Sequence, residues 1–136
     1  MSGQWHTTAL VAVGSAAGAC ARFGLGTPGV TANAMVGLPW GTLAANVAGS
    51  VLIGLYAALR GPGSRWEAKA FEQALVMSGF CGGFTTFSLF TAEVGGCVQR
   101  QQWGLAAALL CVSVVAWLAG VGGGHATGRW LARRND

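Results

Sequence analysis

Four long apolar stretches constrain the fold of this chain more than any other feature. The hydrocarbon core of a bilayer is about 30 Å thick, and a helix needs roughly 20 apolar residues to cross it. Stretches of about that length occupy residues 7–23, 40–59, 71–98 and 103–124, joined by loops at 24–39 and 60–69 and a turn near 99–102. We expect an all-α membrane protein, with residues 1–136 forming one four-helix transmembrane domain.

The composition supports a membrane protein and excludes several other classes. Only 9% of the residues are charged and 53% are hydrophobic, whereas about a quarter of a soluble domain is charged. The high hydrophobicity excludes disorder, and the 23 glycines follow no three-residue period, which excludes collagen. The basic residues are scattered and form no stripe, so we expect a lipid bilayer and no nucleic acid as a partner.

The residues that flank the apolar stretches agree with a multi-pass membrane protein. Five tryptophans lie near the expected span ends, where an aromatic belt is typical: Trp5, Trp40, Trp66, Trp103 and Trp130. Six basic residues fall on the side that holds both termini: Arg60, Arg65, Lys69, Arg129, Arg133 and Arg134. The opposite side has Arg22 and Arg100. This excess alone predicts cytoplasmic termini.

Small residues at helical spacing indicate close packing between the spans. Lipid provides no hydrophobic force between membrane helices, so their contacts favour residues that let backbones approach. The spacing occurs at Gly14 and Gly18, at Ala45 and Gly49, and at Gly120, Gly124 and Gly128. By contrast, no catalytic Ser/His/Asp set, phosphate-binding loop or paired carboxylate is found, so we expect no enzyme.

The second stretch carries a polar stripe formed by Thr42, Asn46 and Ser50 at successive four-residue steps. Such a stripe lies on one helix face. It either joins helices through hydrogen bonds or faces a water-filled path. The amide N–H groups of Asn46 would suit an anion, because they donate without a fixed positive charge.

The third stretch is longer than one span requires and holds glycines and threonines at its centre, between Gly79 and Ser88. These residues have low helix propensity, and a broken helix at mid-membrane is tolerated only inside protein or along a cavity. The break is either a simple kink or an ion site in which unwound carbonyls bind a hard cation such as Na⁺.

A helical face follows this break. Thr86, Phe90 and Glu93 share it, and Phe87 is a neighbour. A carboxyl group inside a span is energetically expensive and marks a functional site by default.

The run from Gly79 to Phe90, GFCGGFTTFSLF, continuing to Glu93, resembles the signature of the Fluc (CrcB) family of fluoride channels. Residues 41–50, GTLAANVAGS, resemble its second motif, and residues 18–23, GACARF, resemble its first. The three motifs follow in order through the first three stretches, and the length and span number agree over the whole chain.

The resemblance implies an antiparallel, dual-topology homodimer with two fluoride pores and a structural sodium ion at the dimer interface. By position, the backbone carbonyls of Gly82 and Thr85 match the sodium ligands. The residues that match the ion pathway are Phe87, Phe90 and Asn46, with weaker matches at Thr42, Thr86, Ser88, Glu93 and Arg22. We add Ser113, which is the only Ser or Thr in the core of the fourth stretch.

The expected function is therefore passive, fluoride-selective export from the cytoplasm, which limits fluoride toxicity. Two features depart from the family pattern: Leu89 replaces a usual threonine, and the six-to-two charge excess is large for dual topology. One alternative is a proton-coupled small multidrug-type transporter, which requires an acidic residue in the first span, and residues 7–23 contain none. The other is a helical scaffold without transport.

Overall fold

The computed structural model describes residues 2–33, 40–62, 64 and 66–134, and this part of the chain is built from helices joined by short connections. In chain order the elements are α1 (Ser2–Asn33), α2 (Trp40–Arg60), α3 (Ala70–Gln73), the π-helix η1 (Ala74–Cys81), α4 (Gly82–Phe84), α5 (Phe87–Gln99) and α6 (Trp103–Arg134). Four helical segments are long and apolar enough to cross a membrane: Gln4–Leu25, Trp40–Arg60, Ala70–Gln99 and Trp103–Arg134. The expected all-α class is confirmed.

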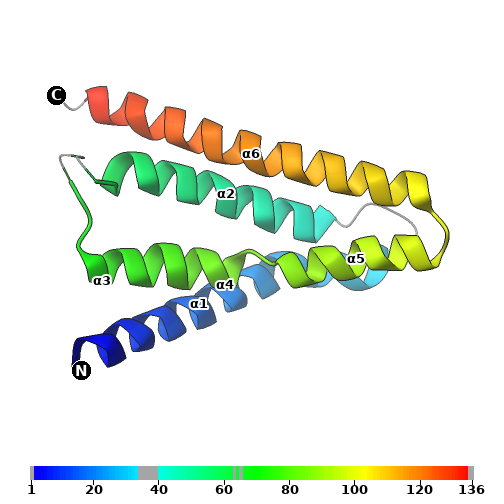
Figure 1. Cartoon of the computed structure of the whole chain (residues 1–136), viewed down its shortest axis with the longest axis horizontal. Helices are drawn as coiled ribbons and strands as arrows, with labels where there is room; N and C mark the ends of the chain where they lie inside the picture. Colours follow the sequence, from blue (N-terminus) through cyan, green and yellow to red (C-terminus); the bar gives the residue numbers. More distant parts are fainter. Residues whose placement is uncertain (1, 34–39, 63, 65, 135–136) are drawn as a thin grey trace.

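The helices are arranged as two closely packed groups (Figure 1). Helix α2 lies along α6, while α1 crosses η1 and α4. The described chain begins and ends at the same end of the molecule, where the connection between α2 and α3 also lies (Figure 1). This arrangement results because the chain runs from one end of the molecule to the other an even number of times.

Glycines let the backbones of α2 and α6 touch. A Cβ atom added at Gly124 would lie 2.2 Å from the carbonyl oxygen of Val51, and one added at Gly54 would lie 2.2 Å from that of Val121. Both distances are far below a van der Waals contact, so no larger residue fits without moving a helix. The expected packing through Gly120, Gly124 and Gly128 is confirmed for this helix pair.

Glycines also let the backbone of α1 pack closely against the third span. A Cβ at Gly18 would lie 2.1 Å from the carbonyl oxygen of Phe80, and a Cβ at Gly83 would lie 2.1 Å from that of Ser15. Since Gly83 sits in the glycine-rich centre of the third span, its lack of a side chain serves packing as well as flexibility.

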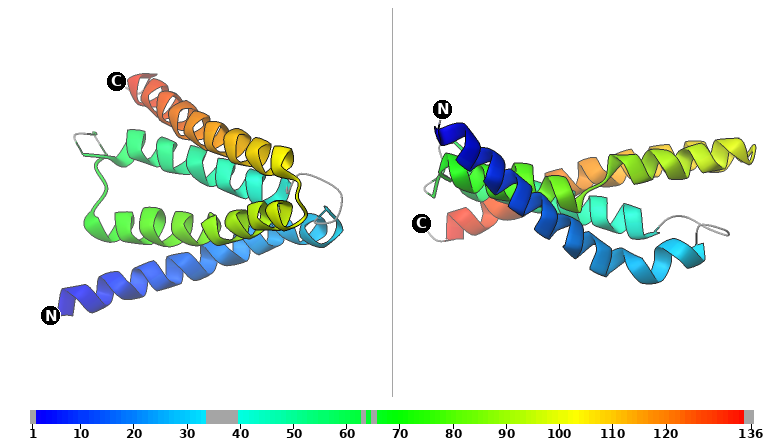
Figure 2. Two further views of the ribbon diagram at one scale, coloured as in Figure 1. Left: turned by 45° about the vertical axis from the view of Figure 1, so that its right-hand side comes forward. Right: turned by 90° about the horizontal axis from the view of Figure 1, so that it is seen from below.

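The third span is interrupted, as expected from its sequence. Helix α4 ends at Phe84, and two residues then adopt extended backbone: Thr85 (φ −82°, ψ 158°) and Thr86 (φ −146°, ψ 118°). Helix α5 begins at Phe87. The break also changes the neighbours of this span, because η1 and α4 contact α1 whereas α5 contacts α6 (Figure 2).

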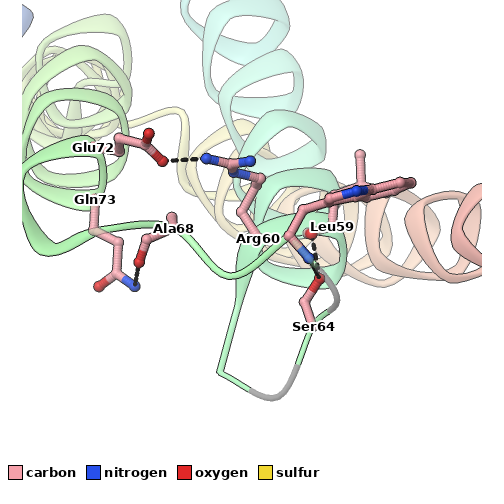
Figure 3. Close-up of polar contacts among 7 residues, drawn as sticks. Leu59, Arg60, Ser64, Ala68, Glu72 and Gln73 are labelled. Carbon is pink, nitrogen blue, oxygen red and sulfur yellow. Dashed lines mark hydrogen bonds and ion pairs between the residues drawn. The ribbon is translucent and has the colours of Figure 1, made fainter.

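The connection between α2 and α3 is tied by polar contacts (Figure 3). Arg60, the last residue of α2, forms an ion pair with Glu72 of α3. The hydroxyl of Ser64 donates to the carbonyl oxygen of Leu59 at 2.5 Å, which satisfies a carbonyl at the end of α2. Arg65, counted above among the flanking charges, lies outside the described residues.

One expected boundary is wrong. The Gly- and Pro-containing loop assigned to residues 24–39 begins later, because residues 24–33 continue α1 as a helix and residues 34–39 lie outside the described part. Proline removes one backbone donor and disturbs the preceding turn, yet a helix can continue past it with a bend. Helix α1 changes direction in its last turns (Figure 2).

Candidate functional site

The break in the third span is held by the side chain of Asn46. This buried residue of α2 donates from Nδ2 to the carbonyl oxygen of Thr86 at 3.0 Å and accepts from the Thr86 N–H at Oδ1 at 2.7 Å. The amide therefore replaces two backbone partners that a continuous helix would have supplied. The Asn46 side chain has two amide N–H bonds; one donates to Thr86, and the second takes no part in these two hydrogen bonds.

Several backbone carbonyls lose their helical donors at this point, and those of Gly82 and Thr85 are two of them. In a continuous helix the N–H of Thr86 would donate to the carbonyl of Gly82, and the N–H of Leu89 to that of Thr85. Here the Thr86 N–H donates to Asn46, and the Leu89 N–H donates to the Thr86 hydroxyl at 3.2 Å. Among the carbonyls released, those of Gly82 and Thr85 are the pair that the family resemblance assigns to sodium.

Further contacts hold Thr85 in its extended conformation. Its N–H and its hydroxyl both donate to the carbonyl of Cys81, at 3.0 Å and 2.8 Å. Its methyl group lies against Gly49 of α2, where an added Cβ would be 2.3 Å away. The break is therefore a defined conformation, fixed from two helices, rather than a simple kink.

Thr42 and Glu93 form a second link between α2 and α5, one helical turn from Asn46 along α2. The Thr42 hydroxyl donates to Oε1 of the carboxylate at 2.5 Å. The second oxygen, Oε2, is buried without a hydrogen-bond partner among the described residues. The polar stripe of the second span thus contacts both the break and the carboxylate beyond it.

Aromatic rings line α5 directly after the break. The Phe87 and Phe90 ring centroids are 5.7 Å apart, and Phe90 meets Trp117 of α6 edge-to-face with centroids 4.9 Å apart. Phe87 is 68% exposed in the single chain, whereas Phe90 is 3% exposed. The row therefore runs from the surface of the chain into its interior.

Three other expected site residues lie near or away from the break in the third span. The hydroxyl of Ser88 lies 3.2 Å from that of Thr86, next to the break. Ser113 is 1% exposed on α6, one turn before Trp117. Arg22 lies one turn beyond Gly18 on α1, and its Nε is buried without a partner among the described residues.

Trp117, which contacts Phe90, was not among the expected site residues. Its position could have drawn attention to it, because five of the six tryptophans lie near span ends and Trp117 lies in the middle of a span. In the described part of the chain, no group of three or more His, Cys, Asp or Glu residues is suited to a metal ion.

Comparison with known proteins identifies the family. A family model described as CrcB-like protein, Camphor Resistance (CrcB), matches residues 9–125. The chain belongs to this family. The CrcB match extends over all four apolar segments and includes the break, the polar stripe and the aromatic row.

Curated relatives of the CrcB family resemble the chain over most of its length. A protein of Rhodopseudomonas palustris named fluoride-specific ion channel FluC 1 is 43% identical over 128 residues, covering 92% of this chain and 88% of the relative. One of Rhodospirillum rubrum, named fluoride-specific ion channel FluC, is 41% identical over 88% of this chain and 92% of the relative. A FluC of Chromobacterium violaceum is 38% identical over 96% of this chain and 100% of the relative. The family is thus one of ion channels, and the expectation of no enzymatic activity is confirmed.

Proposed function

We propose that this protein is a fluoride-selective channel of the bacterial inner membrane. The observation that carries the proposal is the similarity, over nearly the whole chain, to relatives named fluoride-specific ion channels. The channel moves fluoride down its gradient, and in a cell that has accumulated fluoride the direction is outward from the cytoplasm. Passive export of this kind limits fluoride toxicity.

The chemistry of the break region supports an anion pathway. Fluoride is small and strongly hydrated, so a selective path replaces its water with several close, weakly charged donors. The second N–H of Asn46, the Ser88 hydroxyl and the positive edges of the Phe87 and Phe90 rings are donors of this kind. A fixed cation in the same place would bind the anion too tightly for fast release.

The released carbonyls of Gly82 and Thr85 support a structural sodium ion. A backbone oxygen without its helical donor is a suitable ligand for a hard cation. Two oxygens from one chain would leave most of the ion's hydration shell in place, whereas a second copy in the opposite orientation doubles the ligands. A Cβ at Gly82 would meet nothing within 4 Å, so this surface is open to the approach of a second chain.

Fluoride efflux from proteoliposomes, measured with a fluoride-selective electrode, tests the function. We expect rapid fluoride release with little chloride release, and suppression of the flux by Phe87→Ile or Phe90→Ile. Phe71→Ile is the matched control, because Phe71 lies in α3 away from the aromatic row. Equal chloride flux, or full fluoride flux in both pore variants, would remove the assignment.

Removing sodium tests the structural cation separately. Protein purified and reconstituted with N-methyl-D-glucamine in place of Na⁺ should lose most of its fluoride flux and regain it when Na⁺ is restored. Flux that is independent of Na⁺ would leave the channel assignment standing and overturn the cation assignment. The multidrug-transporter alternative has no support in the first span, since residues 4–25 contain no acidic side chain.

A further inference from the structure

The indole N–H of Trp117 is a buried donor without an acceptor among the described residues. A buried donor that loses water and gains no hydrogen bond is costly, and more so within a membrane, where lipid offers no acceptor. Within the described parts of the chain, three other buried side-chain atoms share this state: Arg22 Nε, Tyr56 OH and Glu93 Oε2. Of the four, only Trp117 packs its ring against an expected pore residue.

The position of this N–H follows from the aromatic row. Trp117 lies edge-to-face on Phe90 at an interplanar angle of 73°, and Phe90 in turn contacts Phe87. Phe87 is the exposed end of the row and Phe90 is buried, while Trp117 is partly exposed as a residue but has a buried Nε1. An ion that follows the two phenylalanine rings inward therefore arrives at the neighbourhood of Trp117.

The chemistry of the indole suits a dehydrated anion. Its N–H donates and has no acceptor function, and it carries no formal charge. Hydrogen bonds to ionised acceptors are shorter and about twice as strong as neutral ones. The amide of Asn46 commits one N–H and its oxygen to the backbone of Thr86, so the indole would add a further N–H donor to the one that Asn46 has left.

We propose that the Nε1–H of Trp117 binds the permeating anion beside Phe90, as a third aromatic member of the ion pathway. This inference rests on the proposed function, because it requires an anion to pass along Phe87 and Phe90. The competing assignment is a structural one, in which the indole donates to a carbonyl of a second copy of the chain and never contacts the ion.

Indole NMR separates these assignments without relying on transport. In protein labelled with ¹⁵N-tryptophan and held in lipid nanodiscs, the Trp117 resonance is assigned by its loss in Trp117→Phe. Titration with fluoride should move this resonance downfield to a saturating limit, while the five other indoles and a chloride titration show no such shift. An unmoved Trp117 resonance in protein that conducts fluoride would overturn the inference and leave the proposed function intact. Absence of fluoride conduction in the wild-type protein would instead overturn the proposed function.

Transport by Trp117→Phe gives a second readout. The substitution keeps an aromatic ring on Phe90 and removes the donor. A hydrogen bond to a charged group contributes enough to binding that we expect the fluoride concentration for half-maximal flux to rise about tenfold. Trp103→Phe is the matched control, because Trp103 is exposed at the start of the same helix. A lower maximal flux with an unchanged half-maximal concentration would indicate a structural role and contradict the proposal.

Discussion

Replacing Asn46 with leucine should destabilise the fold through the break in the third span. Leucine has a similar volume but neither donates nor accepts, so the N–H and carbonyl of Thr86 lose their partners. Interhelical hydrogen bonds in membrane proteins contribute about 0.6 kcal/mol on average and up to about 1.7 kcal/mol. Two such bonds at one buried amide predict a loss of about 1–3 kcal/mol, or roughly a 5- to 150-fold change in the unfolding equilibrium.

Equilibrium unfolding in mixed micelles, followed by tryptophan fluorescence, measures this loss. Thr42→Val is the matched control, because it removes one hydrogen bond from the same helix, to Glu93, and leaves the break intact. We expect Asn46→Leu to lose more stability than Thr42→Val and to lose fluoride flux as well. A loss below about 0.5 kcal/mol for Asn46→Leu, or one equal to that of the control, would refute the view that this amide holds the break.

Two further predictions concern packing and charge. Gly124→Ala should destabilise the protein by about 1–3 kcal/mol, because the added methyl would lie 2.2 Å from a carbonyl oxygen of α2. The neighbouring Gly123→Ala is the control: its methyl meets nothing within 4 Å, so this variant should be neutral or slightly stabilised. Thermal unfolding of the two variants side by side measures the difference, and equal melting temperatures would contradict the prediction. A double-mutant cycle on Arg60 and Glu72 should give a coupling below about 1 kcal/mol, since the side chains are 35% and 30% exposed. A larger coupling would mean that this contact is shielded from solvent in the assembled protein.

The location of the break could be predicted from the sequence because residues of low helix propensity gather there, although contacts with α2 also hold it. Two glycines, a phenylalanine and two threonines disfavour a helix here, and the structure interrupts the span at Thr85 and Thr86. Glycines alone do not break a helix, since α6 continues through Gly122, Gly123 and Gly124. The polar stripe and the glycine contacts were also predictable, since both depend on spacing along single helices. These features are properties of short segments.

The partners of the polar groups could not be predicted, because they depend on how segments distant in sequence meet. Nothing in the second stretch indicates that Asn46 binds the backbone of Thr86, 40 residues later. The eight-residue π-helix before the break was likewise unforeseen, as its sequence ALVMSGFC is that of an ordinary apolar helix. The close approach of α1 at Gly14 and Gly18 accompanies this wider helix. The cause lies in tertiary packing and not in the local sequence.

The third span packs its first half on α1 and its second half on α6. A continuous helix moves as a rigid body, so a tilt at one end displaces the other end by a comparable amount. Here the two halves meet only through the extended residues Thr85 and Thr86, and Asn46 fixes that joint to a third helix. We therefore expect a displacement of α1 to be absorbed at the joint before it reaches the aromatic row, so that the spacing of the rings depends little on movements at the other end of the molecule.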